Sequence, residues 1–141
     1  MPVRWDVERG LLDADFAADV DTLLAHSPYA WAVVQGFRSE ETQNALYQKY
    51  RAGGPLAAPP GHSAHEHGLA VDVCEVVDGH DLWDTSRPAW RWLWQAVAAH
   101  PRLHSGHEFP TPPGPDDDHI QSTTWGAVRA RLVAAGQWNA A

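Results

Sequence analysis

The sequence predicts one α+β domain, a small antiparallel sheet with flanking helices. Two observations predict this class. Segments with helical periodicity stand at the start, middle and end of the chain, and short β-branched runs fall between them without regular β-α-β alternation. The chain has 141 residues, a length typical of a single domain, and no repeat or change of composition divides it. We therefore expect residues 1–141 to fold around one core.

The first predicted elements are a helix, a strand and a second helix. Residues 11–26 place apolar side chains at intervals of three and four with aspartates between them, which indicates an amphipathic helix. Residues 30–37 are apolar, aromatic and β-branched and are bounded by turn signals, so they predict a buried strand. Ser39 is the expected N-cap of the next helix, which ends at Gly53.

A loop and a second strand follow. Residues 53–68 are rich in glycine, proline and alanine and contain three histidines near their end. Residues 69–77 are β-branched, which predicts a strand. Because side chains alternate along a strand, Leu69, Val71 and Val73 are expected on one face and Ala70, Asp72 and Cys74 on the other.

The last third of the chain predicts a helix, a long loop, a short strand and a final helix. Ser86 is the expected cap of the first helix, whose inward stripe comprises Trp90, Leu93, Trp94 and Val97. Residues 101–118 contain five prolines and no helical period, which indicates an irregular rim loop. Residues 119–123 predict a strand and residues 125–135 a helix that stops at a glycine.

Composition excludes several classes of protein. The net charge is −8 and the chain has one lysine and no basic run, so we expect no nucleic-acid partner. No run approaches the roughly 20 apolar residues of a membrane span. The first residues lack the apolar core of a signal peptide, so we expect synthesis in the cytoplasm without one. The single cysteine, Cys74, excludes an internal disulfide and a multi-cysteine zinc site.

Histidine is over-supplied, with nine copies, and three residues form a candidate metal site. Two imidazoles and one carboxylate are a common ligand set of catalytic zinc. His65 and Asp72 lie seven residues apart, Gly68 permits a turn between them, and Ala70 is small enough to leave room for an ion. His119, on a later strand, is the third candidate. Spacing alone leaves a metal site and solvated surface histidines as equal alternatives.

Ten residues around these ligands resemble a known signature. Residues 63–72 match all five fixed positions of the Ser-x-His-x-x-Gly-x-Ala-x-Asp pattern of zinc D-Ala-D-Ala peptidases of the VanX/VanY type. This family includes phage L-alanyl-D-glutamate endolysins. Residues 36–39 are similar to the family's arginine-bearing segment, and residues 116–119 to its acidic-x-x-His element. The resemblance spans about residues 30–125 and implies the Hedgehog/DD-peptidase fold.

The resemblance also implies roles for individual residues. It implies one Zn²⁺ ion, with His65, Asp72 and His119 as ligands. Asp116 would be the catalytic acid/base that passes a proton to the leaving amine. Arg38 would bind a substrate carboxylate or the oxyanion of the tetrahedral intermediate. Ser63 would bind the substrate or orient the first histidine.

The chain departs from the family pattern near the last ligand. Residues 103–107 replace a Trp-Gly-Gly-like segment, and Asp118 stands where family members often have proline. Three adjacent aspartates leave the identity of the base open, because Asp117 or Asp118 could point inward in place of Asp116. His107 is a further candidate for a ligand or a substrate contact, with a solvent-facing loop residue as its alternative.

Other polar residues have simpler interpretations. An alternative for Arg38 is an ion pair with Glu41 on the following helix turn. Glu66 and Glu75 are expected to be solvated. Two remaining histidines near the signature are expected at the surface or behind the ligands, namely His62 and His67.

These features predict a zinc metallopeptidase that cuts peptidoglycan stem peptides beside D-amino acids. A bacteriolytic, endolysin-type L-Ala-D-Glu endopeptidase is the first hypothesis and a D-Ala-D-Ala carboxypeptidase the second. We expect a monomer that acts on the bacterial cell wall. Two alternatives come from other classes: an inactive zinc-stabilised binding module, as in the related Hedgehog signalling domain, and a non-haem iron oxygenase, which shares the two-histidine, one-carboxylate ligand set.

Overall fold

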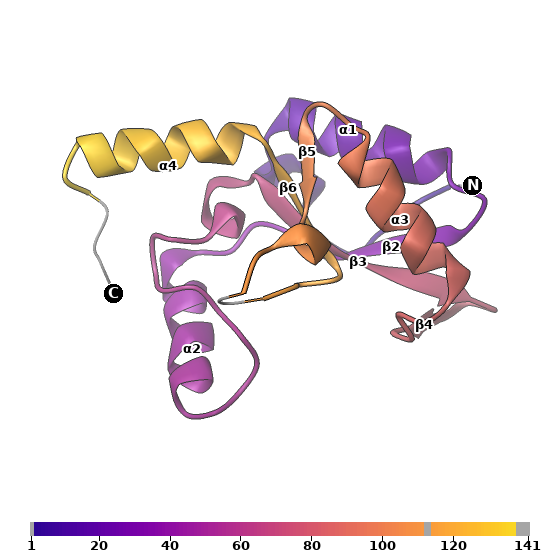
Figure 1. Ribbon diagram of the computed structural model, residues 1–141, viewed down its shortest axis with the longest axis horizontal. Coiled ribbons are helices and arrows are strands. Elements are labelled where there is room, and N and C mark those ends of the chain that lie inside the picture. Colours follow the sequence, from indigo (N-terminus) through magenta and orange to yellow (C-terminus); the bar gives the residue numbers. More distant parts are fainter. Residues whose placement is uncertain (1, 112–113, 138–141) are drawn as a thin grey trace.

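The protein is described by a computed structural model that covers residues 2–111 and 114–137 (Figure 1). The α-helices are α1 (Ala14–Ala25), α2 (Glu40–Arg51), α3 (Pro88–Ala98) and α4 (Thr124–Ala134). The strands are β1 (Arg4–Trp5), β2 (Ala30–Gln35), β3 (Ala70–Val77), β4 (His80–Leu82), β5 (Leu103–Ser105) and β6 (His119–Ser122). Three short 3₁₀ helices are η1 (Arg9–Leu11), η2 (Ala64–His67) and η3 (Gly106–Glu108). Across the described ranges, no helix combines the length and apolarity that a membrane span requires.

The six strands form one sheet with β3 at its centre. The order is β1-β2-β3-β6-β5, and β4 also pairs with β3. The α+β class is therefore confirmed, but the sheet is mixed, because β1 runs parallel to β2 while the other pairs are antiparallel. A parallel pair needs a crossover connection of a dozen or more residues, and the segment that contains α1 supplies it.

One face of the sheet carries the main hydrophobic core, which α1 and α3 cover (Figure 1). The buried side chains of this core come from both helices and from alternate positions of the strands: Leu12, Phe16, Ala17, Val20, Leu24, Trp31, Val33, Val71, Val73, Ala89, Trp90, Leu93, Val97, Leu103 and Ile120. Trp94, which was expected in the inward stripe of α3, packs against this core but is only half-buried. The opposite face of the sheet carries polar side chains, among them Asp72 and His119.

A smaller apolar cluster attaches α4 to the opposite side of the molecule. It consists of Ala64, Leu69, Ala70 and Trp125. Beyond this contact α4 is largely exposed, and in Figure 1 it extends with α2 to one side, away from α3 and β4. Leu69 belongs to this cluster rather than to the face of Val71, because β3 begins one residue later.

The rim loop expected at residues 101–118 contains regular structure. Strand β5 pairs with β6, and η3 follows it directly. A three-residue strand has too few alternating positions to be seen in the sequence, and its pairing partner lies beyond the proline-rich segment. Residues 112 and 113, two of the prolines in this expected loop, lie outside the described residues. Helix α3 also starts later than expected, with Arg87 rather than Ser86 as its N-cap.

Neither of the two glutamates expected to be solvated is free in solvent. Glu75 is 2% exposed, and its Oε1 accepts a 2.7 Å hydrogen bond from the Nε of Arg87. It is buried because it lies on the same face of β3 as Val71 and Val73, the face that carries the core. Glu66 is half-buried, and its carboxylate accepts hydrogen bonds from the backbone N–H groups of Gly61 and Ser63. The second contact completes a capping box at η2.

Gly106 allows η3 to approach the turn before β6. A Cβ atom at this position would collide with the carbonyl oxygen of Asp116 and would lie 2.8 Å from the Cβ of His119. The Asp116 N–H in turn donates a 2.8 Å hydrogen bond to the Gly106 carbonyl. The absence of a side chain is therefore required at this contact.

We predict that Gly106→Ala lowers the free energy of unfolding by about 1–3 kcal/mol, since an overpacked site must shift its backbone. Gly126 is the matched control, because it lies in α4 with nothing within 4 Å of an added Cβ. Gly126→Ala should raise the free energy of unfolding by about 0.5–1 kcal/mol. Urea unfolding of both variants measures the difference, and equal stabilities would contradict the tight contact.

Candidate metal centre and active site

Strand register places Asp72 directly opposite His119. The two residues are paired across β3 and β6, and the preceding pair along β3, Val71 with Ile120, faces the core. Asp72 and His119 therefore share the opposite, polar face of the sheet. The Oδ1 atom of Asp72 lies 3.4 Å from the Nδ1 atom of His119.

The third group, His65, comes from η2 in the loop before β3. The Ser63 side chain caps η2 and accepts a 3.3 Å hydrogen bond from the His65 N–H. Gly68 ends the turn at a φ of 67°, a left-handed conformation that glycine adopts without strain. The resulting turn brings the Nε2 atom of His65 to 3.5 Å from the Oδ2 atom of Asp72.

The structure thus brings together the three residues that the sequence predicted as metal ligands. One potential ligand atom from each of His65, Asp72 and His119 lies within 4.8 Å of the other two, and all three side chains are buried. A second group within the same distance limit combines Asp72 with Asp116 and Asp118.

Hydrogen bonds behind the two imidazoles fix how the rings are turned. Nδ1 of His65 lies 2.9 Å from the carbonyl oxygen of Gly36, and Nε2 of His119 lies 2.8 Å from Oε1 of Gln121. Both oxygens are acceptors, so Nδ1 of His65 and Nε2 of His119 carry the hydrogens. The other ring nitrogen of each histidine then presents its lone pair toward Asp72. Such outer hydrogen bonds are typical of metal-bound histidines.

Asp72 itself has an unpartnered atom. Its buried Oδ1 accepts no hydrogen bond within the described part of the chain. Two imidazole lone pairs and a carboxylate would repel one another without a positive charge between them, so this cluster of three side chains requires a proton or a cation. The donor set and the orphaned oxygen therefore fit a divalent metal ion.

The ionisation of this group reflects burial and mutual contacts. Burial alone would raise the pKa of Asp72, but close contacts with the two histidine rings and their charge lower it below its usual range. Burial likewise opposes the charged form of His119, yet its contacts with Asp72 raise the pKa of the imidazole. In the absence of a metal, the carboxylate is ionised and favours a proton on His119.

Arg38 lies beside the three groups, at the junction of β2 and α2. Its Nη2 atom donates a 3.1 Å hydrogen bond to Oδ2 of Asp72, and its Nη1 atom a 3.3 Å bond to Oε1 of the buried Gln43. The ion pair is thus made with Asp72 rather than with Glu41, the alternative raised by the sequence. Its backbone N–H also donates to the carbonyl oxygen of His65 at 3.1 Å.

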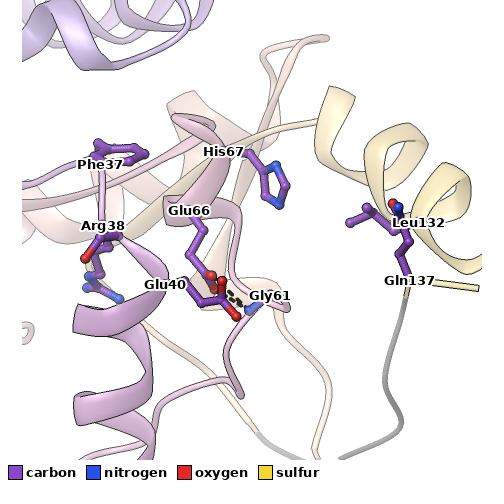
Figure 2. Close-up of a pocket in the computed structure, with 9 residues that line it drawn as sticks. Phe37, Arg38, Glu40, Gly61, Glu66, His67, Leu132 and Gln137 are labelled. Carbon is purple, nitrogen blue, oxygen red and sulfur yellow. Dashed lines mark hydrogen bonds between the residues drawn. The ribbon is translucent and has the colours of Figure 1, made fainter.

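A pocket of about 270 Å³ opens next to Arg38 (Figure 2). Phe37 and Leu132 provide apolar walls, and Glu40 and Glu66 lie on one side with their carboxylates close together. Arg38 lines this pocket, whereas the three candidate metal ligands do not.

The three aspartates before β6 point in different directions. Asp117 turns away from the site, with its Oδ1 2.7 Å from Nδ1 of His107. Asp116 has a side chain that is 45% exposed, and its Oδ2 lies 3.8 Å from Nδ1 of His119. Burial raises the pKa of Asp118 to about 8, and the charge of Asp72 and a hydrogen bond with Asp116 add to this effect. Asp116 is thus the accessible carboxyl next to the histidine.

The remaining histidines of the sequence analysis are not part of the cluster. His107 stacks on Trp94 with ring centroids 3.6 Å apart, so it is neither in the cluster nor a freely solvated loop residue. His67 is exposed and its ring lies 5.1 Å from that of Trp125. His62 is half-buried in the loop before η2.

Sequence reasoning missed three residues that support or flank the site. Gln121 holds His119, and its place two residues further along the strand is the signal that could have identified it. Gly36 holds His65 through a backbone carbonyl, which leaves no signal in residue type. The ring of Phe109 lies 5.4 Å from that of His119. It follows η3, which the sequence did not reveal.

Solved structures of peptidoglycan peptidases share this fold. An L-Ala D-Glu endopeptidase, ChiX from Serratia marcescens, superposes with a TM-score of 0.63 and 22% identity, over 84% of this chain and 86% of that chain. A vancomycin-resistance D,D-pentapeptidase VanY from a VanB-type resistance cassette, in complex with Zn(II), gives 0.60 and 19%, over 89% and 79%. An L,D-carboxypeptidase DacB from Streptococcus pneumoniae gives 0.53 and 26%, over 95% and 78%.

The sequence itself matches a defined family. The pattern described as VanY, D-alanyl-D-alanine carboxypeptidase, matches residues 12–101, which is well over half of the chain. This match includes Arg38, His65 and Asp72, and it ends before β6. Sequence and fold agree, and the chain belongs to the VanY D-alanyl-D-alanine carboxypeptidase family.

Proposed function

We propose that this protein is a zinc-dependent peptidase that cuts the peptide stems of bacterial peptidoglycan. The observation that carries the proposal is the convergence of His65, Asp72 and His119 on one buried point, with both imidazoles held from behind by acceptor oxygens. Membership of the VanY family supports a peptidase over the two alternatives from other classes, the inactive binding module and the iron oxygenase.

Zinc is the metal that best fits these ligands. Two imidazoles and one carboxylate, with a fourth position open, are a common arrangement of catalytic zinc, and the Zn(II) complex of the related VanY structure supports the same choice. His65 Nε2, Asp72 and His119 Nδ1 would hold the ion. When bound, zinc supplies Lewis acidity and lowers the pKa of a coordinated water to about 7.

Asp116 is the residue we assign to proton transfer. Its carboxylate is accessible, lies beside His119, and occupies the position three residues before that histidine that the family resemblance implies. It would take a proton as the nucleophile forms and return it to the nitrogen of the leaving amine. Asp118 is more buried and shares a hydrogen bond with Asp116, so we assign it to support the base rather than to replace it.

Arg38 and the pocket beside it are the proposed substrate contacts. The guanidinium is permanently charged and planar, which suits a substrate carboxylate or a developing oxyanion. Because Arg38 also lines the pocket with Phe37 and Leu132, a peptide in the pocket would lie against it (Figure 2). Ser63 is largely used as the cap of η2, so orienting His65 is its better supported role.

The L-alanyl-D-glutamate bond is the first candidate for cleavage. The similarity to the Serratia marcescens endopeptidase covers most of both chains, which supports this choice. The D-Ala-D-Ala bond is the second candidate, because the family pattern carries that activity in its description. We propose that the protein acts as a monomer on the cell wall.

Digestion of purified peptidoglycan tests the function and identifies the bond. We expect the zinc-loaded protein to release soluble peptide fragments or free D-alanine, with no release after chelation and recovery when zinc is returned. Mass spectrometry should show a new amino terminus on D-glutamate for the first candidate and release of free D-alanine for the second. Fragmentation that persists in chelator would contradict a metallopeptidase.

Asp116→Ala should separate proton transfer from metal binding. Removal of a general acid/base lowers kcat by about 10²–10⁴-fold, while the zinc content should remain one ion per chain because the ligands are untouched. Glu108→Ala, which removes an exposed carboxylate on η3, is the control and should retain wild-type kcat. A normal kcat in Asp116→Ala would remove this residue from the mechanism.

Zinc affinity should decrease as the pH falls. The contacts with Asp72 hold the pKa of His119 above its ordinary value of 6.5, so below that raised pKa a proton must leave the imidazole before the metal binds. We expect zinc affinity to weaken by about tenfold or more per pH unit across the acidic range. Competition titrations with a chelating dye at several pH values measure this. A flat affinity between about pH 5 and 8 would contradict two histidine ligands.

A further inference from the structure

We infer that Trp94 and His107 form a clamp that positions Asp116 through its neighbour Asp117. This inference rests on the proposed function, since it concerns the residue assigned to proton transfer. Trp94 lies on α3 and His107 on η3, and neither touches the three candidate metal ligands in the contacts described. We call these two residues the Trp94–His107 clamp.

The two rings of the clamp hold Asp117 at two points. The indole Nε1 of Trp94 donates a 2.9 Å hydrogen bond to the carbonyl oxygen of Asp117. The ring of His107 lies parallel to the indole, with an interplanar angle of 3° and a centroid distance of 3.6 Å. Its Nδ1 is 2.7 Å from Oδ1 of the same aspartate. Backbone and side chain of Asp117 are thus fixed by one stacked pair.

This arrangement decides which aspartates face the site. Because Asp117 is turned toward His107, the carboxyl groups of Asp116 and Asp118 are left on the side of Asp72. The sequence alone leaves the choice among three adjacent aspartates open, and the clamp provides the physical reason for the choice.

Backbone hydrogen bonds hold the two ends of the turn. The Asp116 N–H donates to Gly106, the His119 N–H donates to the Asp116 carbonyl, and the Val73 N–H donates to the Asp118 carbonyl. The carbonyl of Asp117 is the one that needs a side-chain donor, and the indole supplies it. Loss of that donor would release the middle of the turn while leaving both ends tied.

Trp94 packs against the edge of the main core, but it is less buried than the rest of its stripe. The neighbouring stripe of α3, Trp90, Leu93 and Val97, is at most 1% exposed. Trp94 is only half-buried and points its indole nitrogen at the turn. Burial alone therefore does not account for a tryptophan at this position.

The test is the Trp94→Phe variant, which keeps an aromatic ring for stacking and removes the N–H donor. We expect kcat on a stem peptide to fall about ten- to a hundredfold, as for a small misplacement of a reacting group, with KM unchanged. Zinc content should stay at one ion per chain. Trp92→Phe is the matched control, since Trp92 is a half-buried indole on the same helix that packs against the core. It should retain wild-type kcat.

A double mutant separates positioning of Asp116 from a general structural effect. In an Asp116→Ala background, Trp94→Phe should lower kcat no further, because the residue that it positions is absent. His107→Phe is a second variant that keeps the stacked ring and removes the nitrogen bonded to Asp117. It should lower kcat without changing KM.

Each outcome bears on the inference. Wild-type kcat in both Trp94→Phe and His107→Phe overturns the clamp, as does a loss that multiplies with that of Asp116→Ala. If Asp116→Ala alone has normal kcat, the proton-transfer assignment in the proposed function fails and the clamp fails with it. If Asp116→Ala loses activity and the clamp variants do not, only the clamp fails.

Discussion

The antiparallel pairing of β3 with β6 is the constraint on which the site depends. It sets Asp72 opposite His119 on the polar face, and it sets Val71 opposite Ile120 on the core face. Because side chains alternate with a period of two, a slip of one residue along either strand would move its polar group into the core and expose its apolar neighbour. The hydrophobic core under α1 and α3 therefore fixes the register of the metal centre.

A buried carboxylate is costly unless it is paired, and Asp72 is only partly paired by the protein. Arg38 donates to one of its oxygens at 3.1 Å, while the other oxygen faces His119 without a hydrogen bond. The protein thus compensates part of the desolvation cost of the carboxylate and leaves the remainder for a cation. His65 can be buried for a similar reason, because its Nδ1 atom has a hydrogen-bond partner in the backbone carbonyl of Gly36.

The predictable part of this protein is the part encoded by local patterns. Periodicity located the long helices and the strands that carry Asp72 and His119, and a ten-residue signature pointed to His65. Pairings between distant segments leave little signal in the local sequence. Strands β1 and β5 were therefore not predicted, and Glu75 was wrongly expected to be solvated. The three adjacent aspartates are a further case. The family spacing favours Asp116, but the residue type is the same at all three positions, and contacts with α3 and η3 show that Asp117 faces away from the other two.

His65 and the strand end that carries Arg38 hold each other by two reciprocal hydrogen bonds. The imidazole bonds to the carbonyl of Gly36, and the backbone N–H of Arg38 bonds to the carbonyl of His65. The histidine and the arginine segment consequently behave as one rigid unit, and neither can shift without breaking a bond to the other. The backbone that carries the arginine and the backbone that carries the histidine are thus held at a fixed spacing by two hydrogen bonds.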